Sequence, residues 1–183
     1  LPASWLDTPS AVDLWDRLEA ECVGSIEGCD ALTIPHNSNL SGGLIFQSAR
    51  AEGADLPGPM DREEAQRRSR WEPLVEIMQH KGSSECDSRL PVWQSDEYCD
   101  FEKLPYDRFG AKQSFLVDAK QAAAQNYVRW ALGEGLRVQG ELGANPFQFG
   151  VIGSTDTHIA TPGLTAEKAH PGHGGAGQMA AEG

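Results

Sequence analysis

The stretch Phe147-Gln148-Phe149-Gly150-Val151-Ile152-Gly153-Ser154-Thr155-Asp156-Thr157-His158 joins an apolar run to two residues that commonly bind metals. The apolar part predicts a short buried strand. Residues two apart on extended backbone point the same way, so Asp156 and His158 are expected to face one site. A carboxylate and an imidazole placed in this way can bind the same metal cluster. The alternative is that Asp156 caps a turn and His158 is merely exposed.

Two earlier apolar runs carry residues of the same type. Residues 31–34 are followed by Pro35 and His36, and the run 74–78 contains Glu76. Neutral imidazole is the commonest nitrogen ligand of metals, although His36 can also be a loop residue bonded to backbone. A carboxylate inside an apolar strand is costly unless it is paired, hydrogen-bonded or bound to metal. The alternative for Glu76 is a solvent-facing position on an edge strand.

Apolar spacing predicts helices and strands in alternation. Helices are expected at 10–21, 62–70 and 114–142, and strands at 31–34, 74–78 and 147–152. We expect Gly133 and Gly135 to interrupt the last helix, and the many charges of the second helix to be solvated. The alternation predicts an α/β fold with parallel strands, helical crossovers and long loops. In such folds the active site lies at the C-terminal ends of the strands, where His36, Glu76, Asp156 and His158 fall.

The segment Gln79-His80-Lys81-Gly82 follows the second predicted strand. His80 and Lys81 are candidates to contact an anionic group, and His80 is also a candidate proton donor to a leaving group. Ser83, Ser84 and Glu85 are interpreted as loop-shaping residues. Near the end of the chain, His170 and His173 lie in glycine-rich sequence, which suits either a lid or a flexible tail.

Composition limits the classes of function. The chain has 183 residues with a formal net charge of -12, enough for one domain with a core. The acidic balance argues against a nucleic-acid partner, and no apolar run is long enough for membrane insertion. We expect residues 1–160 to form the α/β domain and residues 161–183 to form a Gly/Ala-rich loop or tail.

Four cysteines allow three pairings. Cys22 and Cys29 flank a glycine-containing turn, and Cys86 and Cys99 bracket a long loop. Two loop-closing disulfides in an exported protein and four reduced thiols both fit this arrangement.

Several motifs occur together in a familiar order: 34–41 (IPHNSNLS), 71–76 (WEPLVE), 79–82 (QHKG), 145–147 (NPF) and 153–158 (GSTDTH). In these the chain resembles the bacterial domain-of-unknown-function 3604 family. That family is similar to the PHP (polymerase and histidinol phosphatase) superfamily of metallophosphoesterases, which are distorted (β/α)7 barrels. The resemblance implies a part of such a TIM-like barrel with two or three divalent ions, of Mn, Zn or Fe.

The resemblance also implies roles for particular residues. His36 matches a late-barrel ligand, Asp156 and His158 match the closing Asp-x-His motif, and Glu76 falls on an acidic strand-end position. PHP proteins open with a His-x-His motif, which this chain lacks. We therefore expect a C-proximal fragment of a longer protein, whose isolated activity is in doubt and whose sheet edges would need partner strands.

The sequence predicts a metal-dependent hydrolase, a phosphoesterase that uses metal-activated water on a small anionic substrate. His36, Glu76, Asp156 and His158 are the predicted metal ligands, with Glu76 and His80 as the predicted catalytic residues. A hydrolase of another ester or amide bond, a non-catalytic binding domain and an inert fragment are the alternatives. A homo-oligomer is left open, and the cysteines with the resemblance favour a periplasmic or secreted protein.

Overall fold

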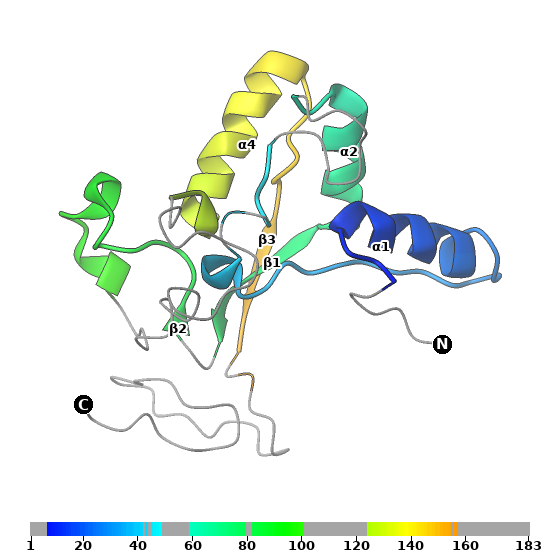
Figure 1. The fold of residues 1–183 in the computed structure, drawn as a ribbon, viewed down its shortest axis with the longest axis horizontal. Coiled ribbons are helices and arrows are strands. Elements are labelled where there is room, and N and C mark those ends of the chain that lie inside the picture. Colours follow the sequence, from blue (N-terminus) through cyan, green and yellow to red (C-terminus); the bar gives the residue numbers. More distant parts are fainter. Residues whose placement is uncertain are drawn as a thin grey trace.

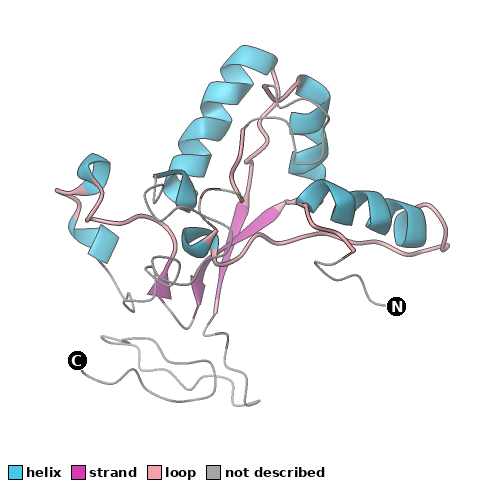
Figure 2. Ribbon diagram, in the orientation of Figure 1, coloured by secondary structure: helices cyan, strands magenta, loops and turns pink. Residues whose placement is uncertain are grey.

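The computed structural model describes residues 7–41, 43, 45–48, 59–79, 82–100, 124–154 and 156. Within these residues it is a mixed α/β structure with a small sheet and helices packed around one part of it (Figure 1). Loops carry much of the chain between these elements (Figure 2). The predicted α/β class is therefore confirmed. Among the described residues, no helix is both long and apolar enough to cross a bilayer.

The sheet has three strands in the order β2-β1-β3. β1 (Leu74–Gln79) pairs parallel with β3 (Gly150–Gly153), as the alternation of helices and strands predicts. β2 (Gly82–Ser83) pairs antiparallel with β1, which the sequence did not predict. In the described part of the chain the sheet is open, with β1 at its centre.

The predicted strand at 31–34 is wrong. This segment runs beside β1 but forms no ladder with it. Thr33 N–H donates at 2.8 Å to the carbonyl of Trp71, which precedes β1, and Glu76 N–H of β1 donates at 3.0 Å to the carbonyl of Pro35, which follows the segment. Pro35 has no N–H with which to extend a ladder. The segment is also less buried than expected, since Leu32 is 49% exposed.

The helices α1 (Ala11–Leu18) and α2 (Arg62–Trp71) begin at the positions that their sequences indicate. Ser10 and Asp61 each cap a helix, and each forms a reciprocal capping box with the acidic residue three positions later. The expectation that all charges of α2 are solvated is wrong for Arg68, which is buried. Its guanidinium bonds Glu72 at 2.9 Å and reaches the backbone carbonyls of Gln47 and Ile45.

The last described helix, α4 (Val128–Leu142), is continuous through Gly133 and Gly135, so the predicted interruption is wrong. A Cβ at Gly135 would lie 3.0 Å from Asn145 Cγ and 3.1 Å from Phe147 Cβ. Glycine at this position therefore allows close packing between α4 and the segment that leads to β3. Residues 114–123 of the predicted helix and the predicted tail 161–183 lie outside the described residues.

The main core lies between the sheet and α4 and consists of Phe46, Val75, Val128, Ala131 and Phe147. A second cluster joins α2 to α4 through Met60, Ala65, Val138 and Ala144. β3 itself was expected to be buried, but Val151 is 58% exposed and Ile152 39% exposed. The apolar residues before β3, rather than the strand, supply the core.

Both cysteine pairs are disulfides, Cys22–Cys29 and Cys86–Cys99. The first closes a turn after α1. The second joins the ends of the loop between β2 and the 3-10 helix Glu97–Asp100, and both of its cysteines are buried. The interpretation with two loop-closing disulfides is confirmed.

Candidate functional site

The middle of β1 brings two of the predicted metal ligands together. Nδ1 of His36 lies 3.9 Å from Oε2 of Glu76, and the two side chains are 64% and 14% exposed. The backbone bond from Glu76 N–H to Pro35 places His36 beside this part of β1. Because β1 is the central strand, the alternative of Glu76 on an edge strand does not apply.

Each member of this pair has an amide neighbour. Gln79 Nε2 donates to Glu76 Oε2 at 3.4 Å, and Asn37 Nδ2 lies 3.1 Å from His36 Nδ1. Oε1 of Gln79 and Oδ1 of Asn37 are buried, and neither has a hydrogen-bond partner within the described structure. A buried polar atom without a hydrogen-bond partner costs free energy. The two amide oxygens beside the pair are therefore acceptors that could still bind a further group.

Asn37 has a left-handed backbone, with φ of 53°, directly after His36. If its amide is rotated by half a turn, Oδ1 replaces Nδ2 beside the imidazole and accepts a hydrogen from Nδ1. Nε2 of His36 would then carry the lone pair. A histidine that donates from one nitrogen and ligates through the other is the usual arrangement at metal sites.

Asp156 lies just beyond β3, at the same end of the sheet as the end of β1. β3 ends at Gly153, which pairs with Met78, and Ser154 N–H donates to the Met78 carbonyl at 3.0 Å. Asp156 has a left-handed backbone with φ of 48°, and its N–H donates to Ser154 Oγ at 3.3 Å. Its position after a parallel strand agrees with the sequence expectation. The extended backbone from which Asp156 and His158 were expected to face one site is wrong at Asp156, because its φ is positive.

Within the described ranges, no three histidine, cysteine or acidic side chains come close enough to form a metal-binding group. His80, Lys81, His158, His170 and His173 lie outside the described residues. The assignment of His36, Glu76, Asp156 and His158 as ligands, and of Glu76 and His80 as catalytic residues, stays a prediction.

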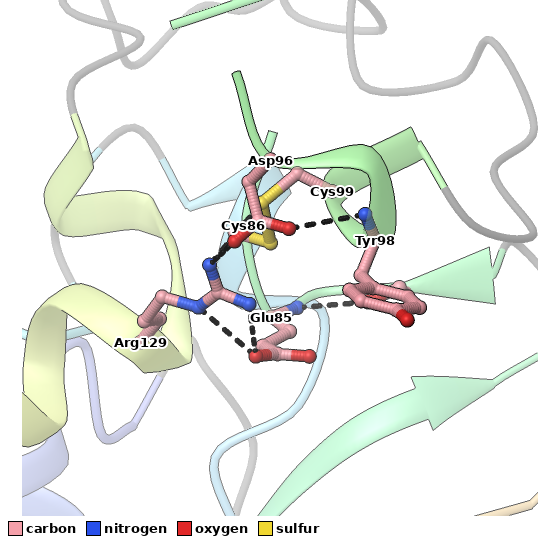
Figure 3. A network of polar contacts seen from close by, with 7 residues as sticks. Glu85, Cys86, Asp96, Tyr98, Cys99 and Arg129 are labelled. Carbon is pink, nitrogen blue, oxygen red and sulfur yellow. Dashed lines mark hydrogen bonds and ion pairs between the residues drawn. A yellow bond between two sulfur atoms is a disulfide. The ribbon is translucent and has the colours of Figure 1, made fainter. Parts of the chain in front are cut away.

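A second polar cluster, which the sequence analysis missed, lies where the loop after β2 meets the start of α4 (Figure 3). Arg129 donates to Glu85 Oε1 from Nε at 3.0 Å and from Nη2 at 2.6 Å, and Nη1 bonds Asp96. The same Nη1 lies 3.5 Å from Cys99 Sγ. One guanidinium thus holds both ends of the disulfide-closed loop. We call Arg129, Glu85, Asp96 and the Cys86–Cys99 disulfide the loop clamp.

The loop clamp also replaces a side-chain cap for α4, because Tyr127 at the N-cap position provides none. The carbonyls of Ser84 and Glu85 accept hydrogen bonds from Val128 and Arg129 N–H, at 3.1 and 3.0 Å. The two carboxylates also lie near the positive end of the helix dipole. The hydrogen bond from Arg129 is the main reason that the pKa of Asp96 is lowered.

A buried hydroxyl, that of Tyr127, bonds the residue that follows Cys86 of the loop clamp. Tyr127 donates to Asp87 Oδ2 at 2.7 Å, and Arg89 also bonds this carboxylate. Burial is the main reason that the pKa of Tyr127 is raised, and the bond to Asp87 adds to it. Tyr127 therefore stays protonated and remains a donor throughout the ordinary pH range.

Glu85 is thus more than a loop-shaping residue, because it pairs with Arg129 across 44 positions. Charges so far apart in the sequence carry no pattern that links them. The one available indication was the spacing of Cys86 and Cys99, since a disulfide there brings Glu85 and Asp96 to the same place.

Residues 1–182 match the family model described as "Protein of unknown function (DUF3604)", and the chain belongs to this family. No curated protein matches the chain, and no solved structure matches it either.

Proposed function

We propose that this chain acts in a metal-dependent hydrolase of phosphoesters, with divalent ions held by His36, Glu76, Asp156 and His158. The observation that carries the proposal is the close pair His36–Glu76, with two buried amide oxygens beside it that lack hydrogen-bond partners. The 3.9 Å approach of Nδ1 to Oε2 sets the imidazole ring beside the carboxylate, and with Nδ1 held by Asn37 the nitrogen left for an ion is Nε2.

Divalent ions at this position would supply a water of lowered pKa and positive charge for the phosphoryl oxygens. The chain's own residues would do the rest. Asn37 would orient the His36 ring, Gln79 would hold the Glu76 carboxylate, and His80 would donate a proton to the leaving group. Two or three ions of Mn, Zn or Fe, and a small anionic substrate, belong to the same proposal.

We propose further that β1 and β3 are two strands of a distorted (β/α)7 barrel of the PHP type. Three features support this: β1 and β3 are parallel neighbours, α4 lies between them in sequence, and the predicted ligand Asp156 follows the C-terminal end of β3. The exposed Val151 and Ile152 of β3 would then be covered when the sheet continues. The two disulfides fit a periplasmic or secreted protein.

The test is metal content by elemental analysis of this chain, of Glu76→Gln and of His158→Ala. Glu141→Gln is the matched control, because Glu141 is an exposed carboxylate on α4 that bonds Arg137. We expect Mn, Zn or Fe in the parent chain and the control, and loss of at least half of it in both site variants. Metal that is unchanged in both site variants, or absent from the parent chain, contradicts the proposal.

The choice of bond is tested separately with a panel of phosphomonoesters, phosphodiesters, sulfate esters, carboxylate esters and amides on the metal-loaded chain. We expect turnover of phosphoesters and its loss in Glu76→Gln. Turnover confined to another bond type would leave the metal site intact and replace the substrate class.

A further inference from the structure

An open pocket of about 510 Å³ lies between the end of β1 and the loop clamp. It is lined by Ile77, Met78, Ser83, Glu85, Tyr98 and Arg129. Apolar atoms form most of this lining. Pockets of this composition commonly bind small molecules.

The lining is suited to an aromatic group. The Tyr98 side chain belongs to a residue that is 69% exposed, although large aromatic side chains normally bury their rings. Met78 adds a polarizable sulfur, and Arg129 adds a planar cation. Thioethers, guanidinium groups and other rings all interact favourably with an aromatic ring.

The charge of the wall excludes the anionic end of a ligand. Arg129 contributes one positive charge and bonds two carboxylates, Glu85 and Asp96, so the three groups together carry a net charge of about -1. A phosphate or sulfate in this pocket would meet an arginine that is already neutralised and a surplus of negative charge. An uncharged ring avoids this cost.

The pocket begins where the predicted metal site ends. Met78 lies two residues beyond Glu76, a separation of about 7 Å along a strand. The pairing with β3 is irregular here, because Glu76 opposes Ile152 while Met78 opposes Gly153. One residue of β1 is therefore extra, and such irregularities re-aim side chains. Ile77 and Met78 consequently both reach the pocket, although neighbours on a regular strand face opposite sides.

We infer that this pocket binds the uncharged aryl part of the substrate, so that aryl phosphoesters are the preferred class. This rests on the proposed function for the identity of the anionic part. The aryl-binding property itself depends only on the pocket. One molecule would place its phosphoryl group at the strand ends and its ring on Tyr98 and Met78.

The first test is equilibrium binding of 2-naphthol, which is uncharged at pH 7, to the whole chain by calorimetry or ligand-observed NMR. Tyr98→Ala should weaken binding about three- to tenfold, the range for loss of one aromatic contact. Tyr98→Phe should retain it, because the ring is kept. Leu136→Ala is the control, since Leu136 is a 67% exposed apolar residue on α4 away from the pocket.

Binding that is unchanged in Tyr98→Ala, or weakened equally in Leu136→Ala, overturns the assignment of the pocket. Cyclohexanol should bind much more weakly than 2-naphthol, and equal affinity would replace an aryl site by a general apolar one. These measurements need neither metal nor turnover.

The second test compares hydrolysis of 2-naphthyl phosphate with that of methyl phosphate by the metal-loaded chain. We expect kcat/KM to favour the aryl ester, and Tyr98→Ala to reduce this preference through KM. Turnover of both esters with no aryl preference overturns the inference and leaves the proposed function standing. If 2-naphthol binds through Tyr98 but no ester is hydrolysed, the proposed function fails and the pocket stands.

Discussion

In the loop clamp, Arg129 bonds two carboxylates beside a buried disulfide, whereas His36 and Glu76 share a single 3.9 Å approach. We call His36 and Glu76 the strand-end pair, because Glu76 lies three residues before the end of β1. The loop clamp satisfies its polar groups with one another. Around the strand-end pair, two buried amide oxygens lack partners in the described structure. The difference teaches that the loop clamp is a structural element whose polar groups bond one another. The strand-end pair, in contrast, has neighbouring polar atoms that could still bind a further group.

The largest effect should come from removing the disulfide of the loop clamp. Replacing Cys86 and Cys99 by serine frees a loop closed over a sequence separation of 13 and puts hydroxyls in place of buried sulfurs. We expect a loss of about 3 kcal/mol in the free energy of unfolding, measured by urea titration. The pocket should lose 2-naphthol binding as well.

The matched control is Cys22→Ser with Cys29→Ser, which opens a shorter and more exposed loop. It should cost less and leave naphthol binding intact. If the two double variants behave alike, the disulfide does not hold the pocket wall and the comparison between the regions loses its basis.

The next effect concerns the packing of α4. Gly135→Ala places a methyl group against Asn145, whose Oδ1 is held by Phe147 N–H at 2.8 Å, and so cannot move away without breaking that bond. We expect destabilisation of about 1–3 kcal/mol by thermal or urea unfolding.

Gly133→Ala serves as the control in the same helix, because nothing lies within 4 Å of its added Cβ. Alanine favours a helix over glycine by about 0.8–1.0 kcal/mol, so this variant should be more stable than the parent. The same sign of change at both positions would contradict the close packing of α4 on the segment before β3.

A smaller effect is expected from Arg129→Ala, which leaves Glu85 and Asp96 without their shared cation. Because Arg129 is about one-third exposed, solvent screens much of this interaction. We expect the free energy of unfolding to fall by about 1 kcal/mol, measured by urea titration. Arg137→Ala removes a half-exposed guanidinium that bonds Glu134 and Glu141 on the same helix, and it should change the stability less. Equal effects would show that the loop clamp is no stronger than an ordinary surface network.

The smallest effect is a dependence on pH. The pKa of Asp96 is lowered from its ordinary value of 3.8, first by the hydrogen bond from Arg129 and then by Tyr98 N–H. The carboxylate of the folded protein releases its proton more readily than that of the unfolded chain. Its stabilisation is therefore complete above the ordinary pKa and is lost as the pH falls through the lower folded value.

Unfolding of the parent chain and of Asp96→Asn at several pH values checks this dependence. The parent should be the more stable at pH 7, and the difference should disappear in strong acid. A difference that persists unchanged in acid would mean that the charge of Asp96 is not what stabilises the loop.

Local patterns made the sequence informative where a single segment decides the outcome. The helix starts at Ser10 and Asp61, the parallel pair β1–β3 and the nearness of His36 to Glu76 all follow from periodicity, capping and strand order. Failures came where distant residues decide. The loop clamp joins positions 85, 96 and 129, and Asn145 is the reason that position 135 needs glycine. Neither requirement can be recognised from the sequence next to these residues.

The segment 31–34 shows a second kind of failure. Its apolar residues indicated a strand, but Pro35 removes a donor and only isolated bonds form. The polar capacity around His36 was equally hidden, because it depends on the orientation of amides that local sequence does not specify.

The attachment of α1 has a consequence for motion. Trp15 is its buried residue, and the indole N–H donates to Thr33 Oγ1 at 3.0 Å, whose hydroxyl in turn donates to the Trp71 carbonyl. Besides Trp15, an exposed ion pair between Asp16 and Arg67 joins α1 to α2. A helix attached by one buried side chain and an exposed ion pair can open without disturbing the core between α4 and the sheet. The backbone amides of α1 should therefore exchange with deuterated water well before those of α4, as a separate cooperative unit.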